Sequence, residues 1–263
     1  ILKENTEERI PLAVQMKETA INVQFWKSYH DIVDISLISP AGVQIGPIPE
    51  VIGTQRFVVG DTEILLYYGE PSPFHVSQEI FIEFLPKDSY ITPGIWQFVL
   101  TPRKIVTGEY DLWLPSENVL NRGTAFRYPT ERGTLTIPST SQRVISVGAY
   151  DSLTFAYADF SGRGGLEGES KPDLVAPGVD ITAPTPSGIY QTFTGTSFAT
   201  PFVSGAAALM MEWGIVRGND PYLYGEKVKA YLRRGARPLP GFTEYPNPQV
   251  GYGALCLRDS LPE

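Results

Sequence analysis

The chain has 263 residues, of which 42% are hydrophobic and 19% are charged, which is the ordinary composition of a globular protein. Its net charge of −8 argues against nucleic acid or an anionic membrane as a partner. The single cysteine, Cys256, excludes an internal disulfide and a cysteine-rich metal site, and no run approaches the ~18 apolar residues of a membrane span.

Short runs of alternating apolar and polar residues fill the first half of the chain. Pro- and Gly-containing turns separate them, and no helical periodicity interrupts them. The runs are Ala20–Trp26, Ile32–Ile38, Glu63–Tyr68, Glu79–Phe84, Ile95–Leu100 and Tyr110–Leu114. Six or more strands at this spacing predict an antiparallel β-sandwich of the jelly-roll kind. Such a sandwich also accounts for the dense aromatic content without a ligand.

The pattern changes after the Gly- and charge-rich stretch 122–133. Val144–Gly148 and Leu174–Gly178 are continuous apolar runs that end in glycine, which is typical of buried parallel strands. Two helices are expected, from Ser197 to about Trp213 and over Gly225–Arg234. The sequence therefore predicts an all-β domain over residues 1–125 and an α/β domain over residues 126–263.

The second predicted helix is amphipathic. Val228 and Leu232 lie four residues apart on its apolar side, and Lys229 is expected on a polar face together with the neighbouring Lys and Arg residues.

The segment Phe193–Leu209 carries the strongest chemical signal. A short β-prone stretch passes through Gly195 into an Ala-rich helix, and Ser197 is expected at the helix start. Backbone N–H groups there have no helical partner, and the helix dipole favours negative charge. This position suits a nucleophile whose own N–H helps to hold an oxyanion. The alternative interpretation is an ordinary capped core helix, because serine is a common N-cap.

Gly195-Thr-Ser-Phe-Ala-Thr-Pro201 resembles the serine motif of the subtilisin-like proteases. Further blocks resemble that family in the same order along the chain, so the similarity covers roughly residues 134 to 263. These blocks are Arg143–Tyr150, Ala158–Arg163, Lys171–Gly178 and Gly251–Leu257.

The resemblance implies the C-terminal part of a parallel-sheet α/β fold and hydrolysis of peptide bonds through an acyl-enzyme on Ser197. It implies a protein or peptide substrate and an extracellular or spore-associated location. Clostridial subtilases associated with spore germination are similar in carrying a jelly-roll insert where this chain has its β domain.

A serine nucleophile needs a base and an orienting carboxylate. The only histidines, His30 and His75, lie in the β-rich half, and neither belongs to a His-Gly-Thr-His-like helix start. The family's Asp-[Ser/Thr]-Gly motif and its oxyanion asparagine loop are also not in the chain. Because these motifs are not in the chain, which begins with Ile1 and not with Met, we expect a C-terminal fragment, inactive alone, whose partner is an N-terminal part with the catalytic Asp, His and Asn. The alternative is a pseudoprotease or a scaffolding module that recruits a protein.

Other candidate sites are weaker. Asp159 and Asp173 are interpreted as turn residues. By family analogy, Thr136 and Pro138 are expected to border the first specificity pocket, while the sequence does not determine the peptide specificity. No cofactor is expected. Calcium occurs in many subtilisin relatives, but no acidic cluster here resembles a loop to which it can be assigned.

Overall fold

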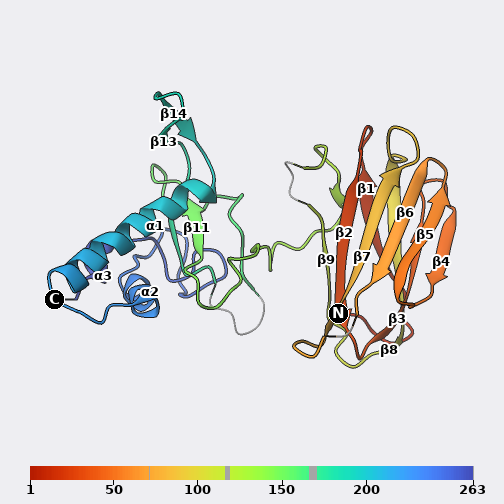
Figure 1. The fold of residues 1–263 in the computed structure, drawn as a ribbon, viewed down its shortest axis with the longest axis horizontal. Coiled ribbons are helices and arrows are strands. Elements are labelled where there is room, and N and C mark those ends of the chain that lie inside the picture. The colour runs from red at the N-terminus through yellow and green to blue at the C-terminus, as the bar shows by residue number, and fades with distance from the viewer. Residues whose placement is uncertain (71, 116–118, 166–170, 263) are drawn as a thin grey trace. The chain divides into compact units, whose positions relative to one another are not determined.

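The structure is a computed structural model that describes all residues except 71, 116–118, 166–170 and 263. The chain divides into two compact units, Ile1–Pro129 and Thr130–Glu263, called here the β unit and the α/β unit. In Figure 1 the β unit runs from red to yellow-green and the α/β unit from green to blue.

The β unit consists of two five-stranded antiparallel sheets. Their strand orders are β10-β1-β8-β3-β4 and β5-β6-β7-β2-β9. Each of the six predicted runs lies within one of these strands, except that Ala20 lies just before β2 and Leu114 just after β9. The bounds are β1 Glu8–Val14, β2 Ile21–Ser28, β3 Ile32–Ile38, β4 Gln44–Ile48, β5 Gly53–Val59, β6 Thr62–Tyr68, β7 Ser77–Pro86, β8 Gly94–Lys104, β9 Tyr110–Trp113 and β10 Ala125–Phe126.

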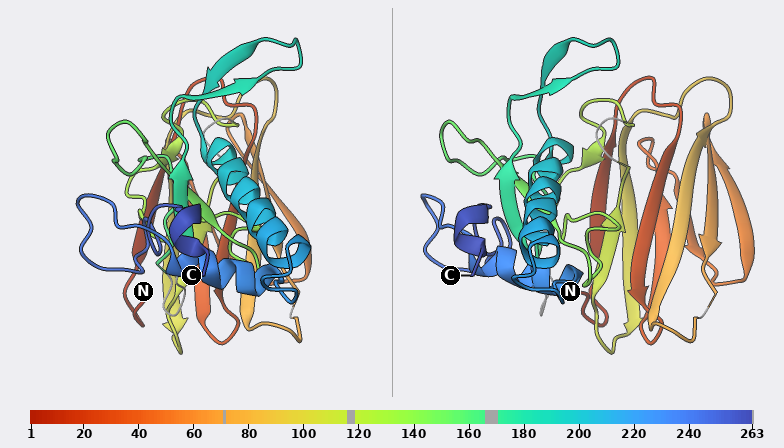
Figure 2. Two further views of the ribbon diagram at one scale, coloured as in Figure 1. Left: turned by 90° about the vertical axis from the view of Figure 1, so that its left-hand side faces the viewer. Right: turned by 60° about the vertical axis from the view of Figure 1, so that its left-hand side comes forward.

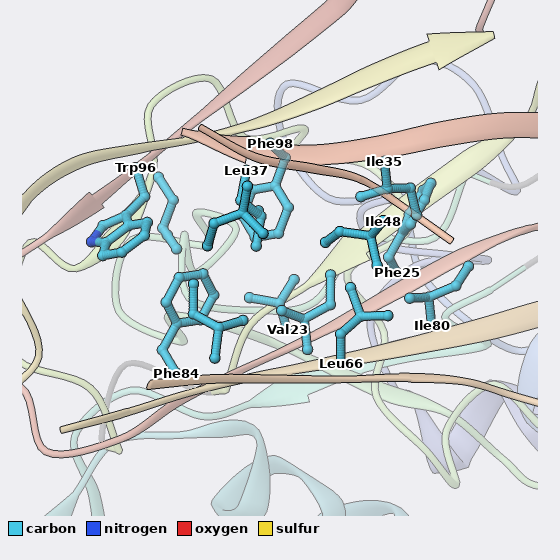
Figure 3. Packing of buried hydrophobic residues seen from close by; sticks show 14 of the residues in the cluster. Val23, Phe25, Ile35, Leu37, Ile48, Leu66, Ile80, Phe84, Trp96 and Phe98 are labelled. Atoms are coloured by element: carbon cyan, nitrogen blue, oxygen red, sulfur yellow. The ribbon is translucent and has the colours of Figure 1, made fainter. Parts of the chain in front are cut away.

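One apolar core joins the two sheets. Inward-facing side chains of β3 and β8 meet those of β2, β6 and β7, and Figure 3 shows the two rows pointing toward one another. The ring of Phe84 meets the ring of Trp96 edge to face at 5.2 Å between centroids. Burial of both rings stabilises the pairing of the sheets through the hydrophobic effect and an aromatic contact.

In the described part of the α/β unit, β11 (Val147–Tyr150) pairs in parallel with β12 (Leu174–Pro177). The sequence predicts such a pair, but the first strand begins at Val147 and not at Val144. An antiparallel hairpin of β13 (Ile181–Pro184) and β14 (Tyr190–Phe193) follows and projects from the unit (Figure 1). The helices are α1 (Thr196–Met211), α2 (Gly225–Arg234) and α3 (Leu257–Ser260). Helix α1 continues as a π-helical turn, η1, over Glu212–Val216.

Helix α1 packs on β11 and β12 with one narrow stripe. Ala199, Val203, Ala206 and Met210 are buried at helical spacing against the apolar residues of these strands. Figure 2 shows two further views of the helix and the strands. Small residues permit a close approach: a Cβ on Gly178, just after β12, would lie 2.6 Å from the Cβ of Ala149.

The opposite side of α1 carries several exposed apolar side chains. The stretch Thr196–Val216 is 21 residues long and contains 18 consecutive residues with a mean hydropathy of 1.2. By length and composition alone it could cross a membrane, a criterion that core helices of water-soluble proteins also meet.

Helix α2 has the predicted bounds and buries Val228 and Leu232. The expectation that Lys229 lies on a polar face is wrong, because this residue is 7% exposed. Its Nζ donates hydrogen bonds to the carbonyl oxygens of Gln142 and Val144, at 2.7 and 2.9 Å. These bonds take the place of the hydrogen bonds to water that an exposed ammonium group makes.

Candidate active site

A glycine turn carries the chain from β14 into α1 and places Ser197 in the first helical turn. Gly195 has φ 154° and ψ 159°, a positive φ that side chains with a Cβ rarely adopt. Its N–H donates to the carbonyl of Gly178 at 2.8 Å, and its own carbonyl accepts the N–H of Phe198 at 3.0 Å. The side chain of Ser197 is exposed beyond this turn.

The helix start is an electropositive position. In the part of the chain that the structure describes, no side chain caps α1 and no acidic residue lies in its first turn. The N–H groups of Thr196 and Ser197 precede the first residue that can donate within the helix. Together with the dipole of a 16-residue helix, they can stabilise negative charge that develops next to the hydroxyl of Ser197.

Two aromatic rings flank the turn. Phe193 ends β14 and Phe198 follows Ser197, and their rings stack at 4.8 Å with an interplanar angle of 11°. The stack holds the two sides of the turn together and forms an apolar wall next to Ser197.

A pocket of about 710 Å³ lies next to the turn, with Thr196 in its lining. Segments 134–136 and 159–163, together with Ser139, form most of its wall. Thr136 is therefore at the pocket, whereas Pro138 is not among the lining residues. Asp159, interpreted from sequence as a turn residue, also lines the pocket.

An ion pair and a cation–π contact of Arg163 lie on one side of this pocket. The guanidinium of Arg163 bonds the carboxylate of Glu131 and lies 5.4 Å from the ring centroid of Tyr157. The backbone N–H of Arg163 donates to Thr134 Oγ1 at 2.8 Å, which joins the two lining segments.

The α/β unit brings no histidine to Ser197, because residues 130–263 contain none. Among the described residues, no side chain forms a hydrogen bond with the hydroxyl of Ser197. Both histidines lie in the β unit. His30 Nδ1 is 3.4 Å from Ser28 Oγ, and the ring of His75 meets Trp26 edge to face at 6.3 Å.

The interpretation of Asp173 as a turn-capping residue is wrong. Its carboxylate is fully buried and accepts the N–H of Ser146 at 2.6 Å and Nε of Arg233 at 2.7 Å. The ammonium groups of Lys171 and Lys229 lie 3.5 and 3.2 Å from its oxygens. Sequence reasoning missed this cluster, which joins β12 and α2 to the loop before β11. Across the described residues, no group of three or more His, Cys, Asp or Glu side chains could hold a metal ion.

Comparison with known proteins gives consistent results. Residues 128–253 match the model of the subtilase family. The serine protease AprX of Bacillus subtilis is 34% identical over 150 residues, which cover 49% of this chain and 32% of that protein. The intracellular serine protease of Paenibacillus polymyxa is 38% identical over 105 residues, covering 38% of this chain and 30% of that protein.

A solved structure extends the similarity to the β unit. The CspB protease of Clostridium perfringens is 39% identical with a TM-score of 0.90, and the match covers 98% of this chain and 54% of that chain. The chain thus spans about a third of the length of these two curated relatives and about half of this solved one.

Proposed function

Because residues 128–253 match the subtilase family model, we propose that the chain is part of a subtilase and that Ser197 is the nucleophile of a serine endopeptidase. The observation that carries the proposal is the exposed hydroxyl of Ser197 in the first turn of α1, directly after the positive-φ turn at Gly195.

The proposed reaction follows from this placement. The oxygen of Ser197 attacks the scissile carbonyl carbon while a base accepts its proton. The negative charge moves onto the carbonyl oxygen, next to the N–H of Ser197 at the helix start. The C–N bond breaks, the proton passes to the leaving amine, and water then hydrolyses the ester on Ser197.

We also propose that this chain is the C-terminal part of a longer protease, whose preceding part supplies the catalytic Asp, His and Asn. Two observations support this: residues 130–263 contain no histidine, and 98% of the chain aligns with 54% of the CspB protease. The chain alone is then inactive, because a serine hydroxyl without a base is a weak nucleophile near neutral pH.

For the β unit we propose a jelly-roll insert over residues 1–125, followed by the C-terminal part of the catalytic domain over residues 126–263. The pairings of β1 and β3 with β8 and of β2 with β7 support the proposal, because each sheet contains neighbouring strands that are far apart in the sequence.

The experiment uses the longer protein that contains this chain and compares Ser197→Ala with Ser204→Ala. Ser204 is an exposed serine of the same helix and serves as the control. Hydrolysis of an unstructured protein substrate should fall about 10⁴- to 10⁶-fold in Ser197→Ala, since triad residues act as a unit. Ser204→Ala should keep its activity. Turnover by Ser197→Ala close to that of the unmodified protein contradicts the assignment.

A further inference from the structure

Three arginine side chains converge on one pocket of the α/β unit, called here the arginine pocket. Its volume is about 1120 Å³. Its lining residues are Arg234, Arg237, Arg258, Asp259, Leu261 and Pro262. Three guanidinium groups and one carboxylate give this lining a net charge of +2, whereas the whole chain has a net charge of −8. The arginine pocket shares no lining residue with the pocket next to Ser197.

A close approach of α2 and α3 brings these side chains together. Arg234 is the last residue of α2, and Arg258 and Asp259 lie in α3. Gly235 directly follows α2 and lies so close to α3 that a Cβ on it would overlap the backbone N of Ser260. The contact places residues from two separate parts of the chain around one pocket.

Two of the guanidinium groups are held in place by neighbouring groups. The backbone N–H and carbonyl of Arg237 form hydrogen bonds with Ala254 at 2.9 and 2.8 Å, and its Nε donates to Asp259 Oδ2 at 2.5 Å. The guanidinium of Arg234 lies 5.2 Å from the ring centroid of Tyr231, a cation–π contact. These contacts leave most of the five N–H donors of each group available, so the groups are oriented and can still bind a ligand.

Arg258 adds a positive charge that no described group balances. Its side chain is exposed, and it forms neither an ion pair nor a side-chain hydrogen bond with the residues that the structure describes. The hydrogen bond from Arg237 is the main cause that lowers the pKa of Asp259, and the charge of Arg258 adds to it. Asp259 is therefore ionised near neutral pH, and two positive charges remain in excess. Their mutual repulsion is relieved when an anion binds between them.

The charge and the donors of the arginine pocket fit a phosphate group. Such a group carries a charge of about −1.5 to −2 at pH 7, which matches the excess of +2, whereas one carboxylate balances only half of it. Guanidinium groups bond phosphate oxygens through pairs of N–H donors. The volume is slightly above the roughly 300–1,000 Å³ of pockets that hold small molecules, so a ligand larger than one phosphate group has room.

We propose that the arginine pocket binds a phosphate-bearing small molecule through Arg234, Arg237 and Arg258. The net charge of the chain, −8, disfavours a nucleic acid or an anionic membrane as the source of the phosphate. The proposal does not depend on the catalytic role of Ser197, because the two pockets are separate.

Isothermal titration calorimetry of the full 263-residue chain near pH 7 and at constant ionic strength tests the proposal. The probes are inorganic phosphate, pyrophosphate, acetate and vesicles that contain phosphatidic acid. The variants are Arg258→Ala, Arg234→Ala and Arg258→Lys, which keeps the charge but not the planar fork. Arg217→Ala is the matched control, because Arg217 is an exposed arginine of the same unit that pairs with Glu212 at 2.8 Å outside the pocket. Thermal unfolding without phosphate measures any structural role of the arginines.

The chain should bind one equivalent of inorganic phosphate, and pyrophosphate more tightly, because its second phosphate group can contact a further guanidinium. Arg258→Ala and Arg234→Ala should each weaken the affinity about 10-fold or more, and Arg258→Lys should weaken it less. Arg217→Ala should bind like the unmodified chain. Acetate and the vesicles should bind much more weakly than phosphate. Without phosphate, Arg258→Ala should have a Tm no lower than that of the unmodified chain, because the substitution removes a repulsive charge.

Four results overturn the proposal. The first is no saturable binding of phosphate or pyrophosphate by the unmodified chain. The second is binding by Arg258→Ala and Arg234→Ala with the affinity of the unmodified chain or of Arg217→Ala. The third is binding of acetate or of the vesicles as tight as that of phosphate. The fourth is an Arg258→Ala chain that is unfolded or melts several degrees lower without phosphate, which would assign this arginine a structural role.

Discussion

The carboxylate of Asp173 is fully buried, and three cationic side chains and one backbone N–H converge on it. Such a cluster is stable only while its charges are balanced, since each ion has lost its hydration. Arg233 adds a second contact, because its guanidinium lies 5.0 Å from the ring centroid of Tyr252. The side chain of Asp173 thereby connects the start of β12 with α2 and with the loop before β11.

We expect Asp173→Asn to destabilise the α/β unit by about 3–5 kcal/mol, because the substitution leaves buried cations without their counter-charge. Chemical denaturation of the full chain measures the change. Asp259→Asn is the control, since Asp259 pairs with Arg237 at 2.5 Å on the surface with both side chains about half exposed, and it should cost much less. Equal losses in the two variants would contradict the role given to the buried cluster.

At the scale of elements, one carboxylate orders the connection between β8 and β9. Asp31 is 1% exposed and accepts the backbone N–H groups of Val106, Thr107 and Gly108 at 2.6–3.0 Å, and the hydroxyl of Thr107 at 2.9 Å. Burial alone would raise the pKa of this carboxyl, but the hydrogen bonds outweigh burial and lower it.

Because the folded pKa of Asp31 is lowered, its stabilising contribution is present above the unfolded pKa of about 3.9. It is lost as the pH falls through the lower, folded value. Asp31→Asn should destabilise the β unit by about 2–4 kcal/mol near neutral pH and should reduce its loss of stability below about pH 4. Denaturation at several pH values measures both effects.

Asp34→Asn is the matched control for Asp31→Asn, because Asp34 pairs with Arg103 at a partly exposed position. An Asp31→Asn protein with the stability and acid dependence of this control would show that the carboxylate does not order the loop.

Local pattern explains which elements could be predicted. β2, β3 and β6 to β8 bury many of their alternate residues, and β9 alternates half-buried with exposed residues, so these strands were visible as alternating runs. β1 contains Pro11, β4 contains Gly46-Pro47, and β5 has Gly53 and the polar Gln55 among its half-buried positions, so these three lack the clear pattern.

The candidate site also has parts that could be predicted from local sequence and parts that could not. Ser197 could be proposed because its motif is contiguous, and its assignment as a nucleophile stays a prediction. The burial of Asp173 and Lys229 could not be predicted, because it depends on contacts between residues far apart. Lys229, for example, contacts carbonyls 85 and 87 residues away in the sequence.

At the scale of the whole molecule, we expect the β unit to fold alone as residues 1–129. Among the described residues, its core cluster contains side chains of this unit only, including Leu2. The N–H of Leu2 donates to the carbonyl of Gly108, and β10 pairs with β1. The isolated unit should give a strand-rich circular dichroism spectrum and one cooperative melting transition.

A shorter form, residues 10–125, lacks Leu2 and the start of β1, so it should melt at a lower temperature than residues 1–129. A helical or disordered spectrum of residues 1–129, or equal melting temperatures of the two forms, would contradict this account of the unit.

Labelling with a fluorophosphonate, followed by mass spectrometry to locate the modified residue, tests the central claim most directly. It compares the 263-residue chain with the longer protein that contains it. We expect rapid labelling of the longer protein at Ser197, no labelling after Ser197→Ala, and no labelling of the 263-residue chain. A label on another serine, a longer protein that does not react, or equally rapid labelling of the 263-residue chain would contradict a subtilase site completed by a preceding part of the protein.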